Sequence, residues 1–255
     1  MTINAYLQDL SANAVLSNAE NEAIARSIDA IGNRLNQHFG GKLDAHFRFG
    51  SSTRGTILPR MYDEASDIDY MVVFADGGYQ PQTYLNQLRR FVHVHYARST
   101  TKQTAPTITL SLHHIRFDLV PATREFWGGY QIPAGQDDWI CTNPNDFNAD
   151  LTEADESNRH LVKPAIRLAK IWNARSGYVL NSYLFEKWIA GGSFWFCTDL
   201  RGYFFSIFDR LEPIERAEWK NNAIRRAKRI IQLARARERA GSFSLAQKAI
   251  SKLFA

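Results

Sequence analysis

The sequence predicts an α+β fold in which a lobe built on a mixed sheet is followed by an all-helical lobe. Two observations support this prediction. Short apolar segments in the middle of the chain have the composition of strands, at residues 46–49, 68–74, 107–112 and 115–120. After about residue 150 such segments stop, and apolar residues recur at helical spacing. We therefore expect N-terminal bracing helices (residues 1–40), a sheet-containing core (41–150) and a helical lobe (151–255).

The N-terminal helix is predicted from its start, its apolar face and its end. Ser17-Asn-Ala-Glu20 has the pattern of a capping box, and Gly40-Gly41 ends the helix. The apolar face consists of Ile24, Ile28, Ile31 and Leu35. A shorter amphipathic segment precedes it, around Tyr6, Leu7 and Leu10.

Further helices are predicted between and after the strands. Pro81 suits the first turn of a helix over about 81–96, whose buried face would be Leu85, Leu88, Phe91 and Val92. The segments 107–112 and 115–120 are close enough to form a hairpin turned at His113-His114. In the C-terminal lobe, helices are expected at residues 161–174, 182–190, 198–209, 213–239 and 244–254, the last with a capping box from Ser244 to Gln247.

Composition excludes several classes of protein. Apolar residues make up 45% of the 255 residues and charged residues 22%, as in ordinary globular domains. Cys141 and Cys197 are far apart and have no Cys or His cluster around them, so we expect two free buried thiols in a reducing cytoplasm and no zinc site. No signal peptide or span of roughly 20 apolar residues is present, which predicts a soluble cytoplasmic protein without membrane contact.

The net charge of +5 indicates a surface that attracts anions, but nucleotides, nucleic acids and acidic membranes all qualify. The helix predicted at 213–239 carries much of this charge, at Arg225, Arg226, Lys228, Arg229, Arg235, Arg237 and Arg239. Such runs are usually solvated faces, and the alternative is a nucleic-acid contact. We expect the aromatic cluster of Phe194, Trp195, Phe196, Tyr203, Phe204 and Phe205 to be helical core, and His93, His95, His113 and His114 to lie at the surface.

A group of carboxylates in the predicted strands indicates phosphoryl-transfer chemistry. Strand alternation places Asp67 and Asp69 on one face, where they repel each other unless a cation lies between them. Asp118 points opposite to Phe117 and Leu119, so it joins the pair if its strand neighbours 68–74. Hard oxygen ligands suit magnesium, and three such carboxylates can hold the two metal ions of an in-line displacement. We predict two Mg²⁺ ions here, with Mn²⁺ as an alternative.

Gly50-Ser51 has the residue types that bind the phosphates of a triphosphate. Glycine allows close approach of the backbone, and the following amide and hydroxyl donate to phosphate oxygens. Gly-Ser alone is usually a turn, and Asp-x-Asp alone is usually an exposed strand end. The order Gly-Ser, Asp-x-Asp and then a later strand-borne Asp is far more specific.

These motifs resemble the DNA polymerase β nucleotidyltransferase superfamily, and more closely its CD-NTase branch of SMODS type, which includes oligoadenylate synthases and cyclic GMP-AMP synthases. The resemblance covers most of the chain. It rests on Gly50-Ser51, Arg54-Gly55-Thr56, Asp67-x-Asp69, Phe117-Asp118-Leu-Val-Pro-Ala122, Trp139-x-x-Thr142-Asn-Pro144, Ile166-Arg-Leu-Ala-Lys170-Ile-Trp172-Asn173 and Ser182-Tyr183-Leu-Phe-Glu186.

The resemblance implies a nucleotidyltransferase core with its active site in the cleft between that core and the helical lobe. It also implies that Lys170 contacts the triphosphate, Ser182 bonds a terminal phosphate and Tyr183 stacks on the donor base. From the residues alone, Lys170 either snorkels to solvent or meets an anion. The alternative to phosphate binding for Ser182 is a helix N-cap, and the alternative to stacking for Tyr183 is a place in the core. The interval from Lys170 to Ser182 is compact for this family.

The favoured function is therefore synthesis of a cyclic or linear oligonucleotide second messenger from nucleoside triphosphates, with a role in bacterial antiphage signalling implied by the resemblance. An RNA or tRNA 3′-end nucleotidyltransferase would use the same carboxylates, with the basic helix binding the acceptor. An inactive nucleotide-sensing or nucleic-acid-binding module is the third alternative. Bases, linkage, product size, activating signal, oligomeric state and effector are left open.

Overall fold

The computed structural model describes residues 1–104 and 106–255, which divide into two compact units. The sheet unit comprises Leu16–Arg54 and Ala65–Asp146, and the helical unit comprises Met1–Val15, Gly55–Glu64 and Phe147–Ala255. This division differs from the predicted segments 1–40, 41–150 and 151–255. The N-terminal helices fall in different units, and the stretch 55–64, inside the predicted core, belongs to the helical unit.

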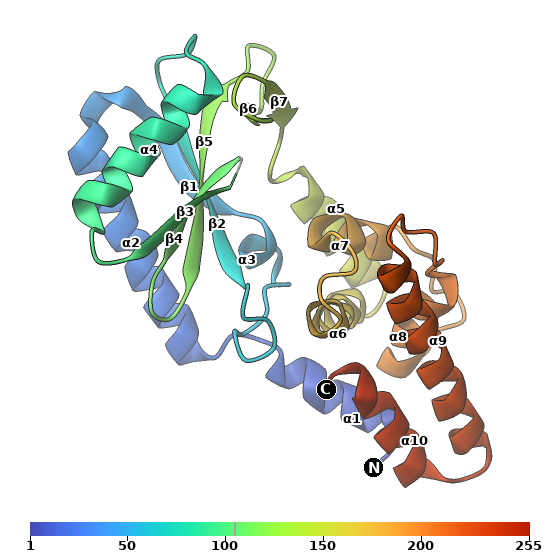
Figure 1. The fold of residues 1–255 in the computed structure, drawn as a ribbon. Coiled ribbons are helices and arrows are strands. Elements are labelled where there is room, and N and C mark those ends of the chain that lie inside the picture. Colours follow the sequence, from blue (N-terminus) through green and yellow to red (C-terminus); the bar gives the residue numbers. More distant parts are fainter. Residues whose placement is uncertain (105) are drawn as a thin grey trace. The chain divides into compact units, whose positions relative to one another are not determined.

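The sheet unit combines a mixed sheet with helices (Figure 1). Its elements are α2 (Asn18–Phe39), η1 (Gly40–Lys42), β1 (Leu43–Phe49), α3 (Ser51–Arg54), β2 (Asp67–Phe74), α4 (Pro81–His95), β3 (Thr100–Thr104), β4 (Thr107–Ser111), β5 (Arg116–Arg124), β6 (Tyr130–Pro133) and β7 (Trp139–Thr142). The strands run in the order β1-β2-β5-β4-β3, and β6 pairs with both β5 and β7. Among the described strands only β2 and β5 pair in parallel.

The predicted hairpin is confirmed, because β4 pairs antiparallel with β5. The sequence analysis missed β3, β6 and β7. β3 consists of exposed polar residues, Thr-Thr-Lys-Gln-Thr, and has no apolar alternation to detect. β6 and β7 have four residues each, too few to show a period.

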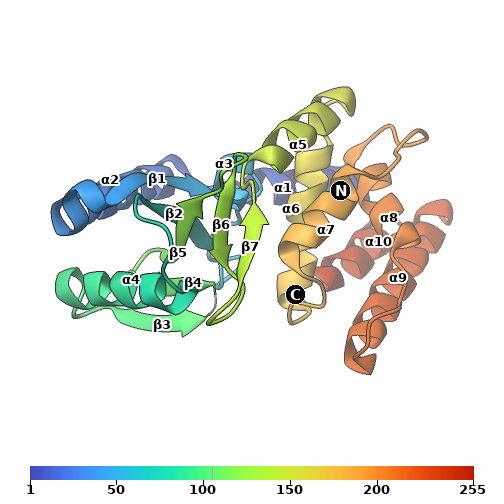
Figure 2. The same cartoon turned by 90° about the horizontal axis from the view of Figure 1, so that it is seen from above.

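One face of the sheet is apolar along its length and is covered by α2 and α4, as the two views agree (Figures 1 and 2). Ile68, Tyr70, Val72 and Phe74 of β2 are buried there. The Tyr70 hydroxyl lies 2.8 Å from His46 Nδ1, and burial raises the pKa of Tyr70 to about 12 while it lowers the pKa of His46. Both side chains are therefore neutral at neutral pH.

The opposite face of the sheet changes character along the strands. Toward the end of β2, Met71 and Val73 form a small apolar cluster with Ala122 of β5, packed against Phe47 and Tyr130. At the start of β2 the same face carries Asp67 and Asp69, because side chains alternate along a strand. One half of this face is thus covered by apolar side chains, and the other half carries the carboxylates.

The helical unit is built around a continuous apolar core. Its elements are α1 (Ile3–Asn13), α5 (Asp146–Ser157), α6 (Val162–Arg175), α7 (Ser182–Ala190), α8 (Leu200–Arg210), α9 (Glu218–Arg239), α10 (Phe243–Ile250) and η2 (Ser251–Leu253). Trp172 of α6 packs edge-on against Phe208 of α8, with ring centroids 4.9 Å apart, and both are buried. No helix among the described residues is long and apolar enough to span a bilayer.

The cations of α6 hold the stretch 55–64 to the helical unit. Arg167 Nη1 donates to the Gly55 carbonyl at 3.1 Å, and Arg175 Nη2 donates to the Met61 carbonyl at 2.9 Å. Lys170 Nζ, between them along α6, donates to the Thr56 carbonyl at 2.9 Å. The Tyr178 hydroxyl adds a bond to Asp63 at 2.5 Å. Side chains of one helix thus bind three carbonyls of this stretch.

Two predicted helix starts are wrong. The helix predicted from Pro213 begins at Glu218, because the Asn221 side chain bonds both the amide and the carbonyl of Glu215 and holds that residue outside the helix. The predicted capping box at Ser244 is absent, since α10 begins at Phe243 and its N-cap, Ser242, makes no side-chain capping bond.

Two burial predictions also need correction. Trp195 and Phe196 are 86% and 100% exposed, so they are not core, whereas Phe194, Tyr203, Phe204 and Phe205 are buried. Trp195 and Phe196, for which the core prediction is wrong, lie in the loop before α8, where helical spacing does not apply. Both cysteines are free, but Cys141 is exposed on the short strand β7 and Cys197 is only partly buried.

The predicted capping box at the start of α2 is confirmed and gives a stability prediction. Glu20 N donates to Ser17 Oγ at 3.2 Å, and Ser17 N donates to Glu20 Oε2 at 2.8 Å. Replacing Ser17 by Ala removes the cap, so the free energy of unfolding should fall by about 1 kcal/mol in urea denaturation followed by circular dichroism. Ser242→Ala is the matched control, because Ser242 makes no capping bond, and it should have a smaller effect. Equal losses would contradict the assignment.

Candidate functional site

Parallel pairing of β2 with β5 brings the predicted carboxylates together. In the register of the two strands, Asp69 is the partner of Asp118 and Asp67 is the partner of Arg116. Neighbouring strands lie about 4.8 Å apart, so paired residues share one face at van der Waals range. All three aspartates are partly buried, and Ile68, Phe117 and Leu119 are buried on the other face. The expected adjacency of the Asp118 strand and the 68–74 strand is confirmed.

An arginine that the sequence analysis missed lies among these carboxylates. Arg116 Nη2 donates to Asp67 Oδ2 at 2.7 Å and to the Ala65 carbonyl. This ion pair offsets part of the repulsion among the three aspartates, since an opposite charge at that distance stabilises the ionised carboxylate. The signal was present in the sequence, because a residue two positions before Asp118 on a strand must share its face.

The Asp118 carboxylate carries an unsatisfied oxygen. Its Oδ1 atom is buried and has no hydrogen-bond partner among the described residues. A buried acceptor without a partner costs roughly 1–3 kcal/mol, and a charged one costs more. Folding tolerates this cost only if other interactions compensate, and such orphaned atoms are typical of positions where a ligand or ion completes the bonding.

Gly50 is required by its contact with Asp69. Its φ is +74°, which disfavours any other residue. A Cβ atom built at this position would lie 1.9 Å from Asp69 Oδ2. The backbone of the Gly50 turn therefore lies directly against a carboxylate of the site, and no side chain fits between them.

The turn after Gly50 leaves one hydroxyl available. The Ser52 hydroxyl donates to the Phe49 carbonyl at 3.0 Å, and the Thr53 hydroxyl donates to the Gly50 carbonyl at 2.9 Å. Within the described residues, Ser51 is the only one of these three consecutive residues whose hydroxyl makes no hydrogen bond. Ser51 is the first residue of the short helix α3. The backbone N–H of a first helical residue has no partner within the helix.

The residues of the site fit a divalent metal ion by chemistry, although no three His, Cys, Asp or Glu side chains among the described residues converge on one point. Asp67 Oδ2 is bonded to Arg116. Asp69 and Asp118 are paired in register, and Asp118 Oδ1 lacks a donor. Carboxylate oxygens with open coordination are the ligands that magnesium takes together with substrate phosphates.

Lys170, Ser182 and Tyr183 belong to the helical unit. Lys170 is buried, so it does not snorkel to solvent: its Nζ lies 2.7 Å from Glu186 Oε1, and the Thr56 hydroxyl donates to Glu186 Oε2 at 2.9 Å. The anion that Lys170 meets in this structure is Glu186. Its predicted contact with a triphosphate stays a prediction.

The other two predicted residues, Ser182 and Tyr183, lie in the first turn of α7. Ser182 is not the N-cap of α7; that role belongs to Asn181, whose side-chain oxygen accepts from Leu184 N at 3.0 Å. The Ser182 hydroxyl makes no hydrogen bond among the described residues and is not needed for capping. Tyr183 is 46% exposed and is therefore not core; Phe147 meets its ring edge-on at 5.8 Å.

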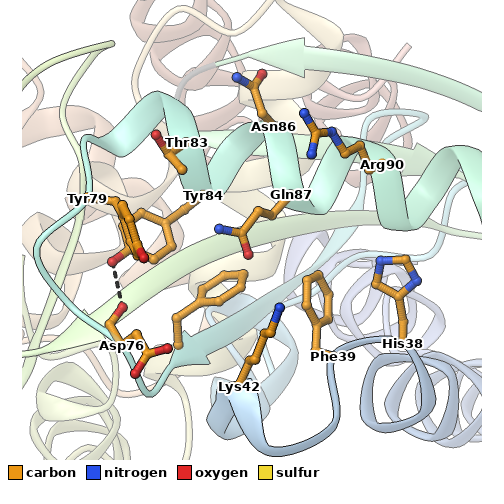
Figure 3. Close-up of a pocket in the computed structure, with 11 residues that line it drawn as sticks. His38, Phe39, Lys42, Asp76, Tyr79, Thr83, Tyr84, Asn86, Gln87 and Arg90 are labelled. Atoms are coloured by element: carbon orange, nitrogen blue, oxygen red, sulfur yellow. Dashed lines mark hydrogen bonds between the residues drawn. The ribbon is translucent and has the colours of Figure 1, made fainter.

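A separate pocket of about 550 Å³ lies in the sheet unit, between the end of α2 and α4 (Figure 3). Its lining includes His38, Lys42, Asp76, Gln87 and Arg90 but none of the predicted site residues. Asp76 follows the end of β2, whereas Asp67 begins that strand. The pocket is therefore distinct from the carboxylate site, and its lining carries charges of both signs.

Comparison with known proteins gives concordant matches. Residues 1–155 match the family described as Second Messenger Oligonucleotide or Dinucleotide Synthetase (SMODS) domain. A curated relative, the probable cyclic nucleotide synthase IK1_05630 of Bacillus cereus (strain VD146), is 33% identical over 114 residues, or 40% of this chain. The match spans about a third of that relative, 34% of its length.

Two solved structures share the fold at low identity. The CD-NTase CdnG of Bradyrhizobium diazoefficiens, solved in complex with GTP, has a TM-score of 0.72 at 12% identity, covering 98% of both chains. CdnC of E. coli MS115-1, solved with ATP, has a TM-score of 0.73 at 14% identity, covering 98% of this chain and 97% of that one. The α+β fold of the polymerase β type that the sequence predicted is thus confirmed.

The contact between Gly50 and Asp69 predicts a measurable difference between two glycines. Gly50→Ala and Gly55→Ala share the cost of a positive φ, roughly 1–2 kcal/mol, but a Cβ at Gly55 meets no atom within 4 Å. Gly50→Ala should therefore lower the free energy of unfolding more than Gly55→Ala does, because it also displaces the Asp69 carboxylate. Chemical denaturation of both variants tests this. Equal losses of unfolding free energy would show that the Gly50 turn accommodates a Cβ atom without additional strain.

The buried pair of Lys170 and Glu186 predicts strong coupling. Lys170→Met should lower the free energy of unfolding by about 3–5 kcal/mol, because it leaves the Glu186 charge buried. The double change Lys170→Met with Glu186→Leu should recover part of that loss. Arg26→Met is the control, since Arg26 and Glu22 are both 72% exposed and such pairs contribute about 0–1 kcal/mol. If Lys170→Met is as mild as the control, the ammonium is not committed to Glu186.

Proposed function

Because this chain belongs to the family of Second Messenger Oligonucleotide or Dinucleotide Synthetase domains, we propose that it joins nucleoside triphosphates into a cyclic or linear oligonucleotide second messenger. In this reaction a ribose hydroxyl attacks the α-phosphorus of a donor triphosphate. The new phosphodiester bond forms as the bond to the β-phosphate breaks, and pyrophosphate leaves. The proposal includes a role in bacterial antiphage signalling, which rests on the family resemblance alone.

The observation that supports the proposal best is the in-register pairing of Asp69 with Asp118 beside the Gly50 turn. Asp67, Asp69 and Asp118 would hold two magnesium ions, with manganese as an alternative. When bound, these ions would neutralise charge on the transferred phosphoryl group. The buried, unpaired Asp118 Oδ1 is suited to accept the proton of the attacking hydroxyl. Arg116 would have to release Asp67 as the site loads.

The nucleotide itself would be bound by groups that the structure leaves available. The Gly50 turn and the Ser51 hydroxyl would donate to the donor phosphates. In the helical unit, the Ser182 hydroxyl would bond a phosphate, the half-exposed ring of Tyr183 would stack on the base, and Lys170 would contact the triphosphate once released from Glu186. The GTP and ATP complexes of CdnG and CdnC support a nucleoside triphosphate as ligand.

The proposal predicts a product that forms without added nucleic acid. Purified protein is incubated with each labelled triphosphate and magnesium, treated with phosphatase and analysed by mass spectrometry. Wild type should yield a small oligonucleotide and pyrophosphate, and Asp69→Asn and Asp118→Asn should each lower the rate by at least about 100-fold, since a metal-binding carboxylate is lost. Asp76→Asn is the matched control: Asp76 is exposed just beyond the other end of β2, and its loss should change the rate less than twofold.

Two outcomes would contradict this function. If the aspartate variants keep near wild-type turnover, the carboxylates do not carry the reaction. If triphosphates alone give no product but an added RNA gains nucleotides at its 3′ end, the protein is an RNA 3′-end nucleotidyltransferase. That result would reassign the acceptor and leave the carboxylate assignment intact.

A further inference from the structure

A second charged pocket lies entirely within the helical unit, remote in sequence from the carboxylates. It has a volume of about 490 Å³ and is formed by α6, α9 and the C-terminal residues. Its lining residues are Trp172, Arg175, Ser176, Trp219, Asn222, Ala223, Arg226, Ala227, Arg229, Ile230, Lys252, Leu253 and Ala255. Four of these side chains are cations from three different elements, and none of the described residues that line the pocket is an aspartate or a glutamate.

The basic helix predicted as a possible nucleic-acid contact divides into two sets of side chains. One set is neutralised within the unit: Arg225 pairs with Glu218 at 2.6 Å, and Arg235 forms a bidentate pair with Asp209 at 2.9 and 2.5 Å. Lys228 donates to the Leu211 carbonyl at 2.8 Å. These cations serve the fold, so they do not form a continuous basic stripe along α9.

The other set faces the pocket. Arg226 and Arg229 of α9 lie one helical turn apart, and Lys252 joins them from η2. Across the described residues, none of these three makes a hydrogen bond or an ion pair. Arg175 contributes a fourth charge, and its bond to the Met61 carbonyl fixes its orientation. Like charges held together repel each other, and an anion between them reverses the sign of that interaction.

We propose that this pocket binds a small ligand that carries two or more clustered phosphate groups. Arginine guanidinium groups match phosphate oxygens in a bidentate geometry, and three of the four cations are arginines. The volume lies in the range of small-molecule pockets. Buried Trp172 and Leu253 give the pocket an apolar base, and Ser176 and Asn222 add uncharged polar groups to its lining. A nucleic-acid strand is disfavoured, because Arg226, Arg229 and Lys252 line one pocket and do not form a stripe along α9.

The test is binding by isothermal titration calorimetry to the full-length chain in EDTA, which makes it independent of the proposed activity. The probes are tripolyphosphate, ATP and inorganic phosphate. Tripolyphosphate should bind, and inorganic phosphate should bind at least tenfold more weakly. Tripolyphosphate affinity should fall at least tenfold in Arg226→Ala with Arg229→Ala. It should change less than threefold in Arg225→Ala with Arg239→Ala, a control that removes the same charge from the same helix outside the pocket. ATP binding that is as tight as tripolyphosphate binding, and that falls at least tenfold in Arg226→Ala with Arg229→Ala, would identify a nucleotide as the source of the phosphates.

Three results would overturn the proposal. Tripolyphosphate affinity that falls equally in both double variants would show a general effect of charge. A second such result uses a 20-nucleotide single-stranded RNA as the probe. If this RNA binds more tightly than tripolyphosphate and its affinity falls equally in both double variants, α9 binds nucleic acid. If the alanine pair does not fold, Arg226→Lys with Arg229→Lys decides: it keeps the charges, removes the guanidinium geometry and should weaken tripolyphosphate at least threefold. Unchanged affinity in that variant would overturn the proposal as well.

Discussion

The parallel pairing of β2 with β5 is the constraint on which the candidate site depends. It places Asp69 beside Asp118 and Asp67 beside Arg116, and a shift of one residue would turn Asp118 to the buried face. Apolar packing on the opposite face of the sheet stabilises that register. There Ile68 and Tyr70 lie beside Phe117 and Leu119 under α2 and α4. The apolar packing of one face therefore fixes the spacing of the charges on the other. Gly50 then becomes obligatory, because the turn that follows β1 is brought against Asp69.

The charged side chains discussed above fall into two groups, those that have a partner among the described residues and those that have none. Buried cations are paired: Lys170 meets Glu186 and the Thr56 carbonyl, and removing either charged partner would leave an isolated charge in the core. In contrast, Asp118 Oδ1 and the side chains of Arg226, Arg229 and Lys252 have no partner within the described residues. The contacts thus separate paired from unpaired charges, which charge counting along the sequence cannot do.

The sequence was sufficient where the physics is local or periodic. The Ser17 capping box, the hairpin of β4 and β5, and the shared face of Asp67 and Asp69 follow from spacing of a few residues. It was insufficient where the choice of hydrogen-bond partner, which spacing does not determine, decides the outcome. Lys170 of α6 pairs with Glu186 of α7, the Asn221 side chain holds Glu215 outside α9, and Asn181 replaces Ser182 as the N-cap. Trp195 and Phe196 are exposed because loop residues obey no helical period. The polar strand β3 had no apolar signal at all.

The stretch from Gly55 to Glu64 has a consequence for how the protein is made. It connects the Gly50 turn to Asp67, yet its carbonyls are bound by α6 side chains that follow 112 to 114 residues later in the chain. During synthesis the sheet unit leaves the ribosome before α6 does, so the α6 side chains cannot bind the loop between the two motifs until α6 has emerged as well. Contacts of such long range form slowly, because a large loop must close first. A nascent chain that ends after β7 would therefore carry every carboxylate of the site without the support that orders the connection between them.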